Sequence, residues 1–201
     1  MNVTRRTLIL TGSAAALMPL PAFAQEAELT VEDVLFDPDG PVLGNPEGDV
    51  TLVEYFDYQC PCCKSGHPML MEAVARDGNI RLVMKDWPIF GGESLRATRL
   101  TLGAAEMGRF EAANAALMAT KARLSAAQVD EALIGAGIDI AAATAAFAGS
   151  ADKWNAYLAR NMRQADSFGL AGTPAYIIGQ TLYSGALTQD VLDEAIRAAR
   201  T

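Results

Sequence analysis

The sequence predicts an α/β domain in which an all-helical segment interrupts the sheet. Two apolar runs of strand length, Val50–Phe56 and Ile80–Lys85, are separated by a stretch with helical character. Strand signals return only at Ala175–Ile178, after a segment (101–160) in which 21 of 60 residues are alanine. Such an alanine content favours helix over strand. A chain of 201 residues accommodates one domain of this kind.

The first 24 residues are predicted to be a cleavable export signal rather than part of the fold. Arg5 and Arg6 form a basic start, residues 7–20 are apolar, and Ala22-Phe23-Ala24 is a cleavage signature. The apolar stretch is shorter than the ~20 residues that a membrane-spanning helix needs. The paired arginines resemble a twin-arginine signal, and an ordinary secretory signal is the alternative. Removal of these residues leaves 177 residues with a net charge of −10, compared with −8 for the full chain.

The mature chain is expected to begin with a short N-terminal segment (25–45) ahead of the main domain (46–201). Thr30–Phe36 is predicted to be a helix, because Thr30 can serve as its N-cap and an acid follows three residues later. Turn-forming residues dominate Asp37–Asp49, which is therefore expected to be a loop. Val50–Phe56 follows as a central strand, since it is apolar, rich in β-branched residues and bounded by turns.

A helix is predicted to run from the cysteine cluster at position 60 to about Arg76, and Ile80–Lys85 forms the next strand. The helical insertion is expected at about 93–160, as several short helices. Ser125 and Gln128 form the capping box of one of them. Glycines at 135 and 137 mark its end, before Asp139 opens another.

The C-terminal part is predicted to be a hairpin followed by a helix. Ala175–Ile178 and Leu182–Ser184 are strand-like and joined by a tight turn at Gly179-Gln180. Thr188–Arg200 is expected to be an amphipathic helix with four inward-facing residues, Val191, Leu192, Ala195 and Ile196.

Composition excludes several classes of protein. A net charge of −8 supplies no basic stripe for phosphates, so no nucleic-acid binding is expected. His67 is the single histidine, which excludes two-histidine zinc sites. Three cysteines are too few for a scaffold held together by disulfides, and all of them lie within four residues.

The cysteine cluster, Cys60-Pro61-Cys62-Cys63, follows a strand and opens a helix. At that place unpaired backbone N–H groups and the helix dipole stabilise a thiolate on Cys60. Its sulfur is expected to be exposed at the helix tip, with Cys63 one turn further in as the resolving thiol. Pro61 suits the first helical position, because its missing N–H would have no partner there. The pattern therefore predicts redox chemistry.

Other interpretations of the cluster are weaker. A zinc site would need a cramped set of the three cysteines with His67, so no metal and no cofactor are expected. A purely structural disulfide would close a loop of only four residues and restrain the unfolded chain little. Cys62 is either a bystander, a competing resolving thiol or a ligand for Cu(I). His67 could lower a thiol pKa, although a packing or surface role fits its position better.

The mature chain resembles the DsbA-like thiol–disulfide oxidoreductases of the thioredoxin superfamily over nearly its whole length. The resemblance rests on the cysteine motif together with a Thr-Pro that opens a strand about 110 residues later. It extends over about Asp37–Arg200, and the segments that carry it are Gly44–Pro46, Glu54–Lys64, Lys85–Gly91 and Gly172–Ala175. It implies a thioredoxin-like fold with the helical insertion characteristic of this family.

The resemblance also assigns roles to residues outside the cysteine motif. It implies that Pro174 is a cis proline beside the reactive disulfide, and that the backbone of Thr173 pairs with an incoming client peptide. Glu54 matches the family's buried acid, for which a raised pKa suits proton exchange with Cys63. The alternative is a Glu54 that points to solvent. Lys85 is expected to pair with Glu54.

The sequence departs from the oxidase prototype of this family at Cys62, where the prototype has a histidine. Thr173 before the proline is closer to the isomerase branch, which leaves the direction of exchange open between oxidase and isomerase or reductase. An oxidase acting on exported clients in the periplasm is favoured, with a Cu(I)-binding copper-tolerance module as a third hypothesis. The resemblance implies a membrane redox partner of the DsbB or DsbD type, and the short N-terminal segment favours a monomer.

Overall fold

The computed structural model describes residues 29–121 and 123–201, so the predicted export signal (1–24) lies outside the described residues. A five-stranded mixed sheet forms the centre of the molecule, with strand order β1-β3-β2-β4-β5. Its strands are β1 (Val42–Gly44), β2 (Val50–Phe56), β3 (Ile80–Asp86), β4 (Ala175–Ile178) and β5 (Thr181–Ser184). The predicted central strand is confirmed, because β2 pairs in parallel with β3 and antiparallel with β4.

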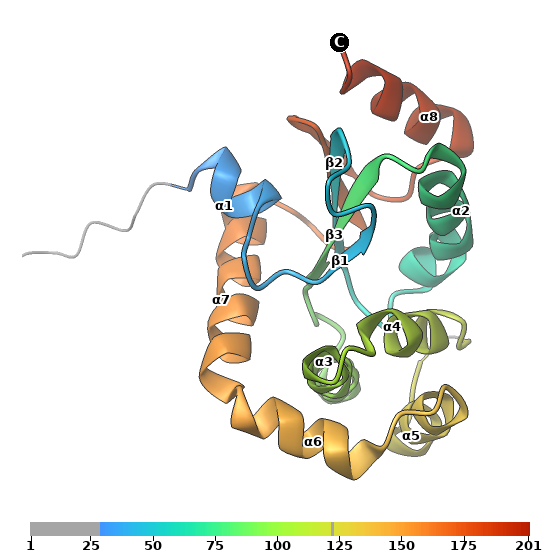
Figure 1. Ribbon diagram of the computed structural model, residues 1–201, viewed down its shortest axis with the longest axis vertical. Helices are drawn as coiled ribbons and strands as arrows, with labels where there is room; N and C mark the ends of the chain where they lie inside the picture. Colours follow the sequence, from blue (N-terminus) through green and yellow to red (C-terminus); the bar gives the residue numbers. More distant parts are fainter. Residues whose placement is uncertain (1–28, 122) are drawn as a thin grey trace, which may run out of the picture.

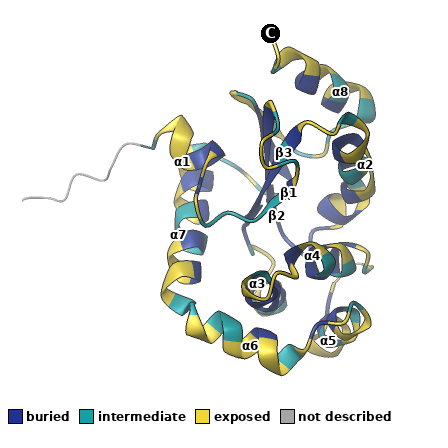
Figure 2. Ribbon diagram, in the orientation of Figure 1, coloured by how far each residue is buried: buried dark blue, intermediate teal, exposed yellow. Residues whose placement is uncertain are grey.

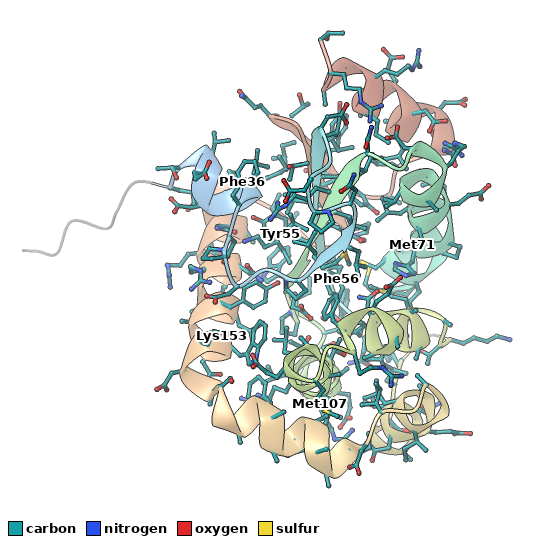
Figure 3. All side chains as sticks on the ribbon, viewed as in Figure 1. Phe36, Tyr55, Phe56, Met71, Met107 and Lys153 are labelled. Atoms are coloured by element: carbon teal, nitrogen blue, oxygen red, sulfur yellow. The ribbon has the colours of Figure 1, made fainter. Side chains whose placement is uncertain are left out.

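Helices cover both faces of this sheet (Figure 1). The helices α2 (Pro61–Asp77) and α8 (Gln189–Ala198) lie on one face, and α1 (Val31–Leu35) lies on the other with α7 (Ala151–Ser167). All seven residues of β2 are buried, which is typical of a strand covered on both sides. Consecutive residues such as Tyr55 and Phe56 therefore belong to two different core clusters, as the side chains in Figure 3 illustrate.

The helical insertion confirms the expectation from alanine content. It comprises α3 (Gly92–Glu106), α4 (Phe110–Met118), α5 (Ala126–Gly135) and α6 (Ile140–Gly149), and continues into α7. Helices α3 and α6 approach closely at Gly103, where a Cβ atom would lie 2.0 Å from the carbonyl oxygen of Ala143. Figure 2 shows that the buried faces of these helices point toward the body of the domain.

Local capping signals predict the helix starts well. Thr30 caps α1 and Ser125 caps α5, and both form complete capping boxes. Asp139 caps α6. Among the described residues no single helix is long and apolar enough to cross a membrane, although the bent pair of α5 and α6 passes that test by length and composition.

Two expectations about elements are wrong. The Asp37–Asp49 stretch is not entirely loop, because Val42–Gly44 pairs antiparallel with β3 as the edge strand β1. Val191 does not face inward: it is 42% exposed, whereas the other three residues named for α8 are buried. Val191 lies at the rim of the apolar stripe, about 100° around the helix from Leu192, where the sheet no longer covers it.

Candidate active site

Cys60 is the N-cap residue of α2 and lies at the end of the turn that connects β2 to that helix. Its backbone is extended (φ −74°, ψ 117°), and Pro61 occupies the first helical position. The Cys60 sulfur accepts a hydrogen bond from the backbone N–H of Cys63, at 3.4 Å. The helix terminus thus directs unpaired donors at this sulfur, as anion sites at helix N-termini do.

The Thr173–Pro174 peptide covers Cys60. This peptide bond is cis, and the Cys60 thiol donates to the carbonyl oxygen of Thr173 over 3.2 Å. Residues 113 positions apart in sequence are thereby brought into contact. The expectation that the Cys60 sulfur is exposed is wrong, since the residue is only 2% exposed. Cys62 is the exposed cysteine of the cluster.

The two thiols of the C-x-x-C pair have opposite acidities. The Cys63 thiol hydrogen-bonds to Cys60, and this bond is the largest of the effects that lower the pKa of Cys60 to about 5. Burial opposes that shift, while the Thr173 side chain and the backbone N–H groups of Cys62 and Cys63 reinforce it. The pKa of Cys63 is raised far above its ordinary value by the same hydrogen bond, by burial and by the charge of Glu54. One thiol is ionised at neutral pH and the other is not.

Glu54 lies fully buried within β2, which removes the solvent-exposed alternative. Burial raises its pKa to about 8, and the Tyr176 hydroxyl on the neighbouring strand moderates the rise. Neither carboxyl oxygen has a hydrogen-bond partner at normal distance among the described residues. A carboxyl group in this environment holds a proton at neutral pH.

Lys85 does not pair with Glu54, and that expectation is wrong. In the parallel register Glu54 lies opposite Met84, so Lys85 projects to the other face of the sheet. There its Nζ forms a buried ion pair with Oδ2 of Asp37 at 2.7 Å. Arg160 binds the same carboxylate at 2.8 Å, and the two cations hold the pKa of Asp37 below its usual range against the effect of burial.

His67 lies within α2, four residues after Cys63, and is buried. Burial lowers its pKa, so the imidazole is neutral at pH 7. This favours the packing role over that of a cation acting on Cys60. In the part of the chain that the structure describes, no group of three or more histidine, cysteine or acidic residues is arranged to hold a metal ion.

Sequence reasoning missed two polar residues beside the cysteine motif, Asp57 and Gln59. Both are buried. The Asp57 carboxylate accepts from the backbone N–H of Gln59 at 2.6 Å, an Asx turn that sets the exit from β2. This turn could have been predicted from the sequence, because Asp57 directly follows the predicted strand and Gln59 lies two residues after it.

Comparisons with known proteins agree with this geometry. A family model described as Thioredoxin matches residues 37–198. The chain is 35% identical to a thioredoxin-like oxidoreductase from Silicibacter pomeroyi, covering 86% of this chain and 98% of that one with a TM-score of 0.81. No curated protein sequence matches the chain.

Two further solved structures are similar. The thiol–disulfide exchange protein alpha-DsbA2 from Wolbachia pipientis is 27% identical, over 83% of this chain and 90% of that one, with a TM-score of 0.77. A periplasmic thioredoxin-like protein from Salmonella enterica serovar Typhimurium is 28% identical, over 84% and 95%, with a TM-score of 0.72. The chain therefore belongs to the thioredoxin family and is one of its DsbA-like thiol–disulfide oxidoreductases.

Proposed function

We propose that this oxidoreductase acts in the periplasm as an oxidase that introduces disulfides into exported client proteins. The observation that carries the proposal is the unequal acidity of Cys60 and Cys63. A cysteine whose thiolate is stable leaves readily from a disulfide, and stabilising the reduced form makes the disulfide more oxidising. This favours the oxidase over the isomerase or reductase direction.

The reaction begins with a Cys60–Cys63 disulfide. A client thiolate attacks the Cys60 sulfur, so a mixed disulfide forms and Cys63 leaves as a thiolate. Because the pKa of Cys63 is so high, this thiolate takes a proton, for which protonated Glu54 is the nearby source. A second client thiolate then attacks the client sulfur of the mixed disulfide. The client gains a disulfide, and Cys60 departs as a stabilised thiolate.

Thr173 and Pro174 supply the surface on which the client is oriented. The Thr173 carbonyl oxygen lies 3.2 Å from the Cys60 sulfur, so a client segment that pairs with this backbone brings its own cysteine to Cys60. Pro61 and Cys62 are exposed next to the same sulfur and border this approach.

Reoxidation of the reduced pair is assigned to a membrane redox partner of the DsbB type, and the protein is proposed to work as a monomer. The periplasmic location is supported by the export signal expected in the first 24 residues and by the similar periplasmic protein from Salmonella. In this proposal the signal is cleaved after Ala24 during export.

The test is oxidative refolding of a reduced client protein. The oxidised wild-type protein is expected to form client disulfides, whereas Cys60→Ser and Cys63→Ser are expected to be inactive, because neither variant can form the Cys60–Cys63 disulfide. Cys62→Ala serves as the matched control and should retain activity. Full activity of Cys60→Ser would eliminate the mechanism. Thiol trapping in cells decides the direction, because an oxidase is found mainly oxidised and an isomerase or reductase mainly reduced.

A further inference from the structure

Gln59, the residue before Cys60, joins three separate segments through one buried side-chain amide. Its Nε2 donates to the carbonyl oxygen of Phe90 and to the hydroxyl of Ser94, each at 3.1 Å. Its Oε1 accepts from the backbone N–H of Leu124 at 2.9 Å. The amide thus ties the β3–α3 loop, the start of α3 and the α4–α5 connection to the strand–helix turn that carries Cys60.

Asp57 also attaches the β3–α3 loop to the turn that carries Cys60. Its Oδ2 accepts from the backbone N–H groups of Ile89 and Phe90, at 2.7 and 3.0 Å. Its Oδ1 accepts from the Ser94 hydroxyl at 2.6 Å, in addition to the N–H of Gln59. The backbone of the β3–α3 loop is therefore fixed by charge-assisted hydrogen bonds, which are stronger than neutral ones.

One of the segments held in this way, the β3–α3 loop, carries an apolar surface. Ile89 and Phe90 are 39% and 44% exposed, although their backbone is anchored to buried groups. The α4–α5 connection has a second attachment, to α2, through a hydrogen bond of 2.9 Å from Lys64 Nζ to Thr120 Oγ1. Residues on both sides of Cys60 in the sequence thus hold parts of the helical insertion beside it.

We propose that Gln59 is a positioning residue that fixes the Ile89–Phe90 loop and the neighbouring Leu124 relative to Cys60, so that the loop contacts the apolar part of a protein client. This inference rests on the proposed function, in which clients meet Cys60. Segments that are held in place before binding lose less conformational entropy when a client docks. Gln59 carries no charge and makes no hydrogen bond to the Cys60 sulfur among the bonds of the described residues.

The inference predicts a dependence on the size of the substrate. A small disulfide or alkylating reagent touches only the sulfur and its immediate donors, so its reaction does not need the loop. A protein client contacts the loop and loses rate when the loop is no longer fixed. A purely structural role for Gln59 would affect both kinds of substrate equally.

Gln164 provides a matched control. It is a buried glutamine (2% exposed, against 7% for Gln59) whose amide also joins distant segments. Its Oε1 accepts from the Tyr55 hydroxyl at 2.8 Å, and its Nε2 donates to the carbonyl oxygen of Asp33 at 3.0 Å. Tyr55 belongs to the core cluster on the face of the sheet away from Cys60.

The experiment compares Gln59→Met with Gln164→Met, since methionine keeps the volume of glutamine and removes its hydrogen bonds. Second-order rate constants are measured for the reduced enzyme with a small disulfide, and for the enzyme carrying the Cys60–Cys63 disulfide with an unfolded, reduced protein client. Gln59→Met is expected to react about tenfold more slowly with the protein client, the loss expected from about one hydrogen bond, and within about twofold of wild type with the small disulfide. Gln164→Met should change neither rate.

Equal losses for both substrates, or no loss for either, would overturn the inference. If Gln59→Met does not fold, Ser94→Ala removes two hydrogen bonds of the same network, one from Gln59 and one to Asp57, while Gln59 keeps its bonds to Phe90 and Leu124. This variant should show the same selectivity with a smaller loss. Failure of the proposed function is a separate result, because the wild-type protein itself would then oxidise no protein client.

Discussion

The Cys63→Ala variant tests how the Cys60 thiolate is stabilised. The largest influence on the Cys60 pKa is the hydrogen bond from the Cys63 thiol, and alanine removes it while leaving the backbone N–H donors in place. A hydrogen bond to a charged group contributes about 1.5–3 kcal/mol. At about 1.4 kcal/mol per pKa unit, its loss raises the pKa by roughly 1–2 units. The pKa of Cys60, about 5 in the wild-type protein, is therefore expected to become about 6–7.

The assay is a pH titration of the thiolate, by its ultraviolet absorbance or by the rate of alkylation. At about pH 5.5 the wild-type Cys60 is roughly three-quarters ionised, and the variant is expected to be about one-quarter ionised or less. Cys62→Ala is the control, because Cys62 contributes only its backbone N–H and should leave the titration unchanged. An unchanged pKa in Cys63→Ala would refute this reasoning and assign the stabilisation to the helix terminus alone.

Three further predictions concern buried groups. Glu54 has a folded-state pKa of about 8 against an ordinary 4.5, so the native state keeps a proton that the unfolded chain releases, and the free energy of unfolding falls as the pH rises between these values. Glu54→Gln should abolish this fall and gain on the order of 3 kcal/mol at pH 7 in chemical denaturation; an unaltered pH profile would contradict it. Tyr176→Phe removes the hydroxyl that favours the carboxylate, and should raise the pKa of Glu54 in an infrared titration, whereas a lowered value would refute the assigned direction. Lys85→Met breaks a buried ion pair with Asp37 and should cost roughly 3 kcal/mol of stability, while the Cys60 titration stays as in wild type; a shifted titration would show that Lys85 does act on the site.

The partner of Lys85 could not be predicted from the sequence, because it depends on the register between two strands. Strand alternation fixes that neighbouring residues face opposite sides, but the register between β2 and β3 decides which residues share a side. That register places Met84 beside Glu54 and sends Lys85 to Asp37, which lies in a loop 48 residues earlier. Charge complementarity alone predicts a pair between a lysine and an acid on adjacent strands, because it carries no information on the strand register.

Features that depend on local chemistry can be predicted from the amino-acid sequence. The caps at Thr30, Ser125 and Asp139, the strand β2 and the start of α2 at the cysteine motif all follow from residues within a few positions of one another. The acidity expected for Cys60 also follows, because a helix N-terminus is a local structure.

The groups that surround these local elements come from distant parts of the chain, and they are seen only in the folded protein. The burial of Cys60 under Thr173, the hydrogen bonds of Gln59 to Phe90 and Leu124, and the edge strand β1 all join parts of the chain that are 31 to 113 residues apart. No local pattern encodes such contacts, because each depends on how the whole chain packs around the sheet.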